Sequence, residues 1–394
     1  MDLDLRALVQ ATRLLPAATA RNAREERERL VRQLVAGRIA EPRWELRPPR
    51  SVLAELRRLD RLRREAALLP CAALYGPRLD ELELELCLMS HLGSPKQLRP
   101  LSARRFGTGA VQVEICGQKR TVAQVARAIL DRIATDEDPK VVPAVAEGPG
   151  QESLAAVMRR CIDGVGLSAR VVLEPALVAG AATGDRTVYL AARSFGVRET
   201  ERLAVHEVLG HLTAAANGRA QPIRLLEWGT ADSFTDQEGL ALYLEDAHGL
   251  LDRRRLRTLA GRVVATDAMH ADASFTETSR LLHRDEGFPA EEAVILTERA
   301  YRGGGIARDV SYLIGFLRVL AAFEQGSADV DALRAGRLSL SAVRFLPQLR
   351  QQGLARPAIY RPNLARSLFS TISGTTPCRL PPKAAASLIK LELT

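Results

Sequence analysis

The chain has 394 residues, of which 46% are hydrophobic and 26% are charged. Both fractions are near the average of soluble globular proteins and exclude a mainly disordered chain. The length allows two or three domains of roughly 100–200 residues. Since no apolar run approaches the ~20 residues that span a bilayer, we expect no membrane span. The first residues also lack the basic and apolar regions of a secretory signal.

Cysteine usage favours a reducing compartment. The five cysteines are odd in number, lie far apart and form no CxxC pair: Cys71, Cys87, Cys116, Cys161 and Cys378. This pattern argues against a disulfide framework and against a cysteine-type zinc site. We therefore expect a cytoplasmic protein.

The basic net charge of +9 indicates little about partners. Arginine accounts for 51 of the 56 Lys and Arg residues, a skew typical of a GC-rich, bacterial genome. The Arg-rich N-terminal helices carry mixed charges, and aromatic residues, which stack on bases, make up only 4% of the chain. These features argue against a specific nucleic-acid partner, and a salt titration of binding to generic DNA would test that alternative.

The first 150 residues predict a mainly helical region. Helical patterns cover four stretches: 2–15, 22–37, 53–92 (with breaks near Pro70 and Pro77) and 122–133. Between them we expect an extended connector at 38–50 and a loop-rich segment at 93–120. An acidic, Pro- and Gly-rich linker at 136–150 predicts a domain boundary.

The second part of the chain combines two β-like runs, at 170–174 and 187–191, with many helices. A helix at 197–216 should end at the C-cap pair Asn217-Gly218, and a second helix should cover 235–247. Further helical patterns follow: 251–267, 290–302, 309–325 and parts of 329–352. The predicted fold class is α+β, helix-dominated, with a small sheet beside the central helices.

These boundaries divide the chain into four expected parts. They are an N-terminal helical extension (1–50), a helical subdomain (51–150), a catalytic domain (151–355) and an irregular C-terminal segment (356–394).

The most informative stretch is His206-Glu207-Val208-Leu209-Gly210-His211, an HExxxH pattern rather than the familiar HExxH. In an ideal α-helix, at ~100° per residue, the two histidines lie ~140° apart and cannot bind one metal ion. One inserted residue, a π-bulge, reduces this angle to about 40°, so we predict a π-bulge here. The alternative is a pair of buried histidines bound to backbone carbonyls.

A zinc hydrolase uses three protein ligands and leaves one position for water. A Glu beside the first His acts as general base in such sites, the role we expect for Glu207. The third ligand should come from a neighbouring helix, and Glu238 in the segment 237–241 (QEGLA) is the candidate. Glu245 competes with it, because it lies seven residues further along much the same face.

Other metal sites fit the sequence less well. The remaining histidines have no metal-like spacing: His91, His248, His270 and His283. A di-iron site would need histidines three residues after Glu207 and Glu238, where the chain has Gly210 and Ala241.

These residues resemble the bacterial QEGLA-motif proteins, which carry the label flavohemoglobin expression-modulating and are similar to the microtubule-associated tyrosine carboxypeptidases. The resemblance covers roughly 40–350 and is most specific at 206–241. The segments that carry it are 74–76, 81–83, 206–211, Asn217-Gly218, Gln221-Pro222, Gly229, 237–241, 298–304 and 309–315.

The resemblance implies a zincin-like, helix-rich fold with a small sheet beside the active-site helix. It implies one Zn²⁺ per chain, bound by His206, His211 and Glu238. It also implies that Glu207 is the catalytic base and that Gln237 is not a ligand.

Two arginines and a tyrosine in the C-terminal signature are candidate substrate residues. A carboxypeptidase must bind a free carboxylate, which Arg302 or Arg299 could hold with two hydrogen bonds. Tyr312 could donate a hydrogen bond to the oxyanion. The alternative is that Arg302 caps helix carbonyls beside a glycine hinge at 303–305.

Together these features predict a zinc metallopeptidase. We expect it to remove a C-terminal residue from a peptide or protein by Glu-assisted attack of a zinc-bound water. The alternative is a regulatory or non-catalytic zinc-binding protein of the same fold, but a closed structural site would not need Glu207 beside the metal.

Overall fold

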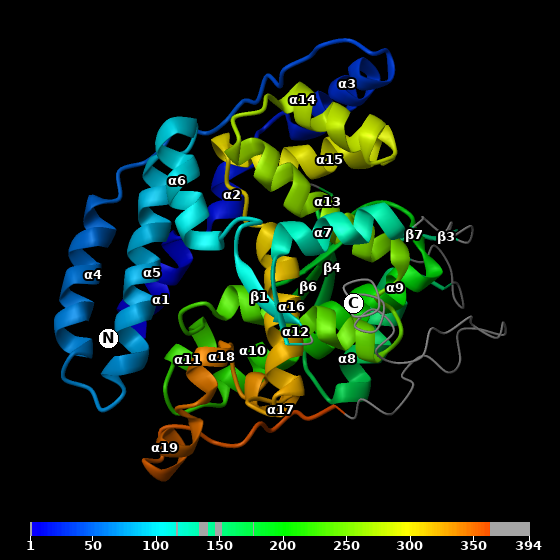
Figure 1. The fold of residues 1–394 in the computed structure, drawn as a ribbon. Helices are drawn as coiled ribbons and strands as arrows, with labels where there is room; N and C mark the ends of the chain where they lie inside the picture. The colour runs from blue at the N-terminus through cyan, green and yellow to red at the C-terminus, as the bar shows by residue number, and fades with distance from the viewer. Residues whose placement is uncertain (1, 116, 134–140, 146–151, 176, 363–394) are drawn as a thin grey trace. The chain divides into compact units, whose positions relative to one another are not determined.

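The structure is a computed structural model that describes residues 2–115, 117–133, 141–145, 152–175 and 177–362. These residues form two compact units. Figure 1 labels their helices and strands. Unit 1 contains residues 2–133 and 256–314, and unit 2 contains the described residues of 141–255 and 315–362. Helices dominate both units and the sheets are small, which confirms the predicted helix-dominated α+β class. The four-part division of the chain stays a prediction.

Unit 1 is built mainly from helices. Its elements are α1 (Asp2–Ala11), α2 (Leu14–Ala18), α3 (Ala23–Val35), α4 (Leu53–Ala66), α5 (Ala72–Ser90), α6 (Pro95–Phe106), β1 (Gln112–Ile115), β2 (Gln118–Thr121), α7 (Val122–Arg132), α14 (Phe275–Arg280), the π-turn η2 (Leu281–Asp285), α15 (Ala290–Tyr301) and the 3₁₀ turn η3 (Arg302–Gly304). The predicted break near Pro77 is wrong. Pro77 lies inside α5, which continues through it from Ala72 to Ser90.

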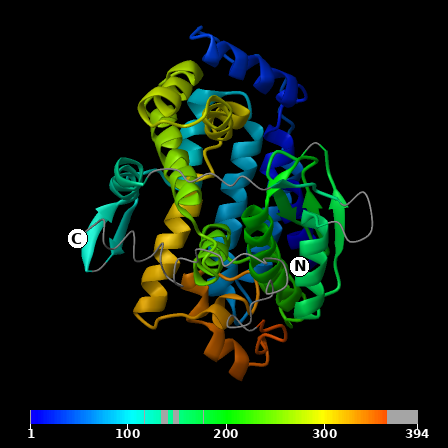
Figure 2. The ribbon, with the colours of Figure 1, turned by 90° about the vertical axis from the view of Figure 1, so that its right-hand side faces the viewer.

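The loop-rich prediction for 93–120 is also wrong. Pro95 opens α6, a position that proline favours because the first helical N–H has no intrahelical partner. The antiparallel hairpin β1–β2 follows and leads into α7 (Figure 2). A capping box starts α7, in which Thr121 and Gln124 bond each other's backbone N–H groups.

Unit 2 contains five strands among its described residues. Most of its helices follow these strands in the sequence. Its elements are β3 (Val141–Val142), α8 (Leu154–Val165), β4 (Arg170–Leu173), β5 (Ala181–Thr183), β6 (Thr187–Leu190), β7 (Phe195–Gly196), α9 (Val197–Ala204), the π-helix η1 (Val205–Leu212), α10 (Thr213–Arg219), α11 (Leu225–Trp228), α12 (Ser233–Ala247), α17 (Val330–Leu333), α18 (Leu340–Val343) and α19 (Leu346–Gln351). Two further helices contain the boundaries between the units: α13 (Arg253–His270) and α16 (Val310–Glu324).

The principal sheet of unit 2 has the strand order β4-β6-β5. The two β-like runs of the sequence form its parallel pair, in which Arg170 to Leu173 lie opposite Thr187 to Leu190. The third strand, β5, pairs antiparallel with β6 and comes from the Gly/Ala-rich segment between the runs. A separate antiparallel pair joins β3 to β7.

The elements α9, η1 and α10 form one continuous helical run whose apolar side chains are buried in unit 2. Asn217 and Gly218 lie inside α10 and do not form the predicted C-cap. Gly218 serves close packing instead, because a Cβ there would lie 2.5 Å from the carbonyl oxygen of Leu226. Across the described residues, no helix is both long and apolar enough to cross a bilayer.

Candidate metal centre

The helical run passes through HExxxH as a π-helix. The segment η1 spans Val205–Leu212, and therefore both histidines. This confirms the prediction of an inserted residue, since the wider turn places side chains five residues apart on one side. Gly210 stands inside this segment, and the helical run continues without interruption on both sides.

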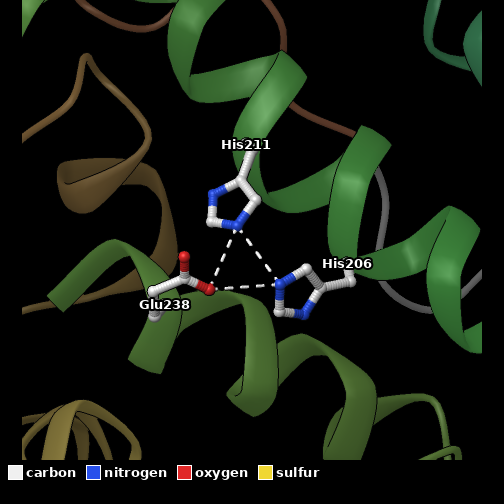
Figure 3. A group of neighbouring side chains, drawn as sticks. All are labelled: His206, His211 and Glu238. Atoms are coloured by element: carbon white, nitrogen blue, oxygen red, sulfur yellow. Dashed lines mark hydrogen bonds and ion pairs between the residues drawn. The ribbon is translucent and has the colours of Figure 1, made fainter. Parts of the chain in front are cut away.

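Three polar atoms converge between η1 and α12 (Figure 3). The Nε2 atoms of His206 and His211 lie 3.2 Å apart. The Oε2 atom of Glu238 lies 3.2 Å from the first nitrogen and 3.4 Å from the second. His206 and Glu238 are buried and His211 is partly exposed. Two imidazole nitrogens and a carboxylate oxygen form a donor set able to hold a divalent metal ion.

Small residues bring α12 close enough to η1 to complete this group. A Cβ on Gly210 would lie 3.0 Å from the Cβ of Ala241. On another face of α12, a Cβ on Gly239 would lie 2.1 Å from the carbonyl oxygen of Gly315 in α16. Gly239 and Ala241, which follow Glu238, therefore allow α12 to approach α16 and η1 closely.

The charges of the group are coupled. Burial opposes the ionised form of Glu238, but the neighbouring His211 and His206 outweigh burial and hold its pKa well below the usual range. Burial also disfavours a charge on His206, yet hydrogen bonds to Glu238 and Glu245 raise the pKa of His206 to about 9. A cation bound here would replace the positive charge that these histidines supply to the carboxylate.

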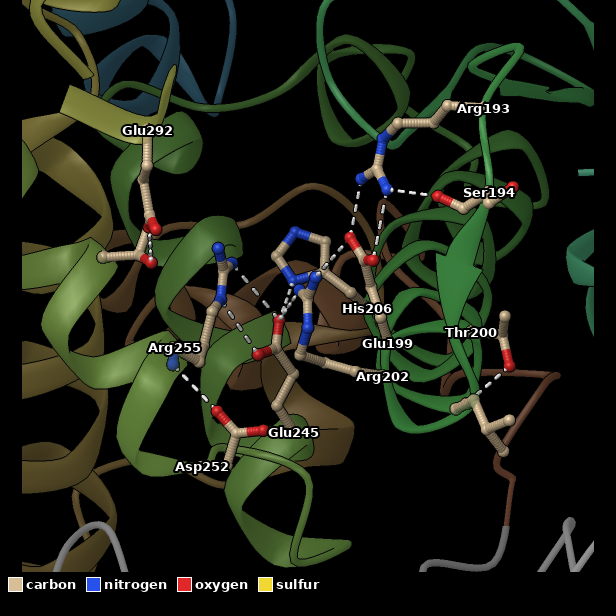
Figure 4. Close-up of polar contacts among 12 residues, drawn as sticks. Arg193, Ser194, Glu199, Thr200, Arg202, His206, Glu245, Asp252, Arg255 and Glu292 are labelled. Carbon is tan, nitrogen blue, oxygen red and sulfur yellow. Dashed lines mark hydrogen bonds and ion pairs between the residues drawn. The ribbon is translucent and has the colours of Figure 1, made fainter. Parts of the chain in front are cut away.

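Glu245 contacts the other ring nitrogen of His206, Nδ1 (Figure 4). His206 Nδ1 donates a hydrogen bond of 2.6 Å to Glu245 Oε1. The carboxylate is fully buried beside Arg255 and Arg202, at 3.3 and 3.5 Å. Burial favours its neutral form, but the charges of the two arginines outweigh burial and lower the pKa of Glu245 to about 2. Glu245 thus lies apart from the three converging atoms.

Glu207 is buried and faces strand β5. The hydroxyl of Thr183 lies 2.7 Å from Glu207 Oε2 and 3.1 Å from the backbone oxygen of the same residue. No hydrogen bond to Oε1 is made by the residues that the structure describes. The carboxylate is therefore held through one oxygen, while the other is available to exchange a proton.

The three candidate substrate residues belong to unit 1. Arg299 makes an ion pair through Nε with buried Asp309. The guanidinium of Arg262 stacks over the ring of Tyr312, 4.5 Å from its centroid. Arg302 is buried, and its Nη2 atom has no hydrogen-bond partner among the described residues. Burial and the nearby Arg299 lower the pKa of Arg302 to about 10.

Three other motif residues, Asn217, Gln221 and Gln237, bind backbone groups between residues 333 and 360. The side-chain amide of Asn217 donates to the carbonyls of Arg334 and Tyr360. Gln221 binds the backbone of Ala335 and Arg356. Gln237 donates through Nε2 to the carbonyls of Leu333 and Leu338.

Sequence reasoning missed Thr183, Arg202 and Arg255. Thr183 lies in the short strand β5, whose Ala-Ala-Thr sequence has no alternating hydrophobic pattern. The spacing of Glu238 and Glu245, seven residues apart, did signal that both face η1, but it could not assign them to different nitrogens of one imidazole.

Comparison with known proteins assigns the family. A family model described as microtubule-associated tyrosine carboxypeptidase matches residues 36–373, which is most of the chain. A search among curated proteins finds no match. The matched region includes all the residues of the metal centre described above, and the chain therefore belongs to the microtubule-associated tyrosine carboxypeptidase family, whose members are carboxypeptidase-like enzymes.

Proposed function

We propose that this protein is a zinc-dependent carboxypeptidase whose metal is held by His206, His211 and Glu238. The observation that carries the proposal is the triangle of ligand atoms, with edges of 3.2, 3.2 and 3.4 Å. Tetrahedral zinc with bonds of ~2.0–2.1 Å requires ligand atoms roughly 3.3–3.4 Å apart. The donor set also matches the His₂Glu combination of catalytic zinc sites.

Zinc at this position would polarise the scissile carbonyl and lower the pKa of a water molecule. Glu207 then acts as the general base and later delivers the proton to the leaving amine. Its hydrogen bond from Thr183 fixes the carboxylate through Oε2 and leaves Oε1 for proton transfer. Family membership supports a peptide or protein C-terminus as the substrate.

For the substrate carboxylate we propose Arg302, with Tyr312 as a hydrogen-bond donor to the oxyanion. The unpartnered Nη2 of Arg302 supports this role, because a buried guanidinium gains most from an anion that satisfies it. Arg299, which we also predicted to bind substrate, is better suited to holding Asp309.

We place this reaction in the cytoplasm. The cysteines that the structure describes, Cys71, Cys87 and Cys161, are free thiols, in keeping with a reducing compartment.

Two measurements test the proposal. The purified protein should bind one zinc ion per chain, and His206→Ala, His211→Ala and Glu238→Ala should each lose stoichiometric metal. The zinc-loaded protein should shorten peptides of a C-terminal library by one residue, read by mass spectrometry. Absence of stoichiometric zinc, or cleavage only at internal bonds, would contradict the proposal, and zinc without cleavage would favour the regulatory alternative.

A further inference from the structure

Glu245 is a buried acid that the reaction itself does not use. It lies two turns after Glu238 in α12, and its side chain is 0% exposed. Removing a carboxylate from water is unfavourable unless partners compensate its charge. Here the partners come from other helices, with Arg202 in α9 and Arg255 in α13. The arrangement therefore joins three helices around one carboxylate.

The contact that Glu245 makes is specific to one atom of a metal-binding residue. Its Oε1 is 2.6 Å from Nδ1 of His206, whereas Nε2 of the same ring faces His211 and Glu238. An ionised carboxylate can only accept a hydrogen bond, so Nδ1 must carry the proton. The lone pair of Nε2 is then the one available to a metal ion.

The two arginines are arranged to keep Glu245 in place. Arg202 Nη1 lies 3.5 Å from Oε1, and Arg255 Nε lies 3.3 Å from Oε2 (Figure 4). Arg202 also lies 3.7 Å from Glu199, which forms a closer pair with Arg193 at 2.7 Å. Arg202 precedes His206 by four residues, so the two side chains lie about one helical turn apart. Both contact the same carboxylate oxygen, Oε1 of Glu245.

We propose that Glu245 is a positioning residue for His206: it fixes the imidazole orientation and the Nδ1–H tautomer, so that Nε2 is presented to the metal. Arg202 and Arg255 act through Glu245 by holding its carboxylate. This inference rests on the proposed metal site. It means that Glu245 hydrogen-bonds a metal ligand and does not bind the metal itself. Hydrogen-bond partners of this kind change metal affinity by about 10–100-fold when they are removed.

The test compares Glu245→Gln with Glu227→Gln, measuring zinc affinity by competition with a chromogenic chelator. Glu227 is a matched control, because it is also a buried Glu of unit 2, paired with Arg224 at 3.0 Å. Glu245→Gln should still bind one zinc ion, but about 10–100-fold more weakly than wild type. Glu227→Gln should bind zinc as wild type does. An unchanged affinity in Glu245→Gln would overturn the proposal.

Cobalt substitution distinguishes a positioning residue from a ligand. The visible spectrum of cobalt-loaded Glu245→Gln should keep the intensity of the wild type, because the number of ligands stays the same. Loss of a ligand in this spectrum would overturn the proposal and make Glu245 part of the first coordination layer. If wild type itself fails to bind stoichiometric zinc, the proposed function fails instead.

A measurement on the wild-type chain keeps the test independent of variant folding. Zinc-loaded protein labelled with ¹⁵N-histidine should show His206 with a protonated Nδ1 and a metal-bound Nε2. The opposite assignment, with Nδ1 on the metal, would overturn the proposal. Arg255→Gln, which leaves Glu245 in the chain, should weaken zinc binding in the same direction by a smaller factor.

Discussion

Gly210 of η1 packs directly against Ala241 of α12, so closely that a Cβ on Gly210 would lie 3.0 Å from the Ala241 Cβ. The two helices in contact here are those that carry the three converging ligand atoms. The absence of one methyl group thus sets the separation between the histidines and Glu238.

Gly210→Ala should consequently destabilise the protein by about 1–3 kcal/mol, because the new methyl group overpacks a contact with little freedom to adjust. It should also weaken zinc binding by moving Glu238 away from the histidines. Gly76→Ala provides the control, since Gly76 lies in α5 with nothing within 4 Å of an added Cβ. It should stabilise by about 0.5–1 kcal/mol. Urea unfolding measures both, and a stabilised Gly210→Ala would contradict the close-packing argument.

Metal removal should lower thermal stability. A metal that binds only the folded chain stabilises it by mass action, about 2.7 kcal/mol at a free metal concentration of 100 Kd. Differential scanning calorimetry with chelator and with added zinc should therefore show a higher Tm for the loaded protein. The same comparison in Glu238→Ala should show little change, and an equal zinc-dependent rise there would mean that zinc binds elsewhere.

Glu207→Gln should keep zinc and fold but lose turnover by about 10²–10⁴-fold, the usual contribution of a general base. Thr183→Val should give a smaller loss of kcat with unchanged zinc content, because it removes the hydroxyl that contacts Glu207 and leaves His206, His211 and Glu238 in place. Zinc analysis and peptide cleavage on the same preparations check both variants. Loss of zinc in Glu207→Gln would instead make Glu207 a ligand.

Arg302→Ala and amidation of the substrate's C-terminus should produce the same loss of kcat/KM, because each removes one side of one ion pair. The two losses should not add when they are combined. Steady-state kinetics on matched free and amidated peptides provide the measurement. Equal cleavage of the two peptides by wild type would rule out recognition of the terminal carboxylate.

Acidic pH should lower the free energy of unfolding of unit 1, because it protonates Asp309. Burial raises the pKa of this carboxyl, but the neighbouring Arg299 and Arg262 outweigh burial and hold its pKa far below the usual ~3.9. Because the folded-state pKa is depressed, the stabilisation is fully present above pH ~4 and is lost as the pH falls below that value. The free energy of unfolding, measured from pH 7 to pH 2, should decline in this range.

Asp309→Asn should be less stable than wild type by about 3–5 kcal/mol at pH 7, since it leaves buried arginines without their counter-ion. The difference should shrink below pH ~4. Exposed Asp285→Asn serves as the control and should follow wild type throughout. A difference for Asp309→Asn that does not vary with pH would contradict the ion-pair explanation.

Spacing alone was sufficient to predict the π-helix, because an α-helical HExxxH cannot direct both histidines to one point. The helical pattern predicted at 235–247 begins within two residues of the start of α12. Local patterns failed where tertiary packing decides. Gly218 looks like a helix terminator but fills a close contact with Leu226, and Pro77 looks like a break but lies inside α5.

Hydrogen bonds between residues distant in the sequence could not be predicted from the sequence. The partner of Glu207 lies 24 residues upstream in a strand without a recognisable pattern. The roles of Asn217 and Gln237 depend on carbonyls more than 90 residues downstream. The sequence shows that an Asn or Gln is present, but only the fold shows whether its amide binds backbone carbonyls or substrate.

The hydrogen bonds of the Asn217 side-chain amide in α10 also constrain the order in which parts of the chain can fold during synthesis. The helical run that carries the two histidines is synthesised well before Tyr360, whose backbone Asn217 binds 143 residues later. Until that segment has been translated, a fully buried side chain of this helix has unsatisfied donor and acceptor groups. The helix that carries His206 and His211 should therefore reach its final packing only after residue 360 has been translated.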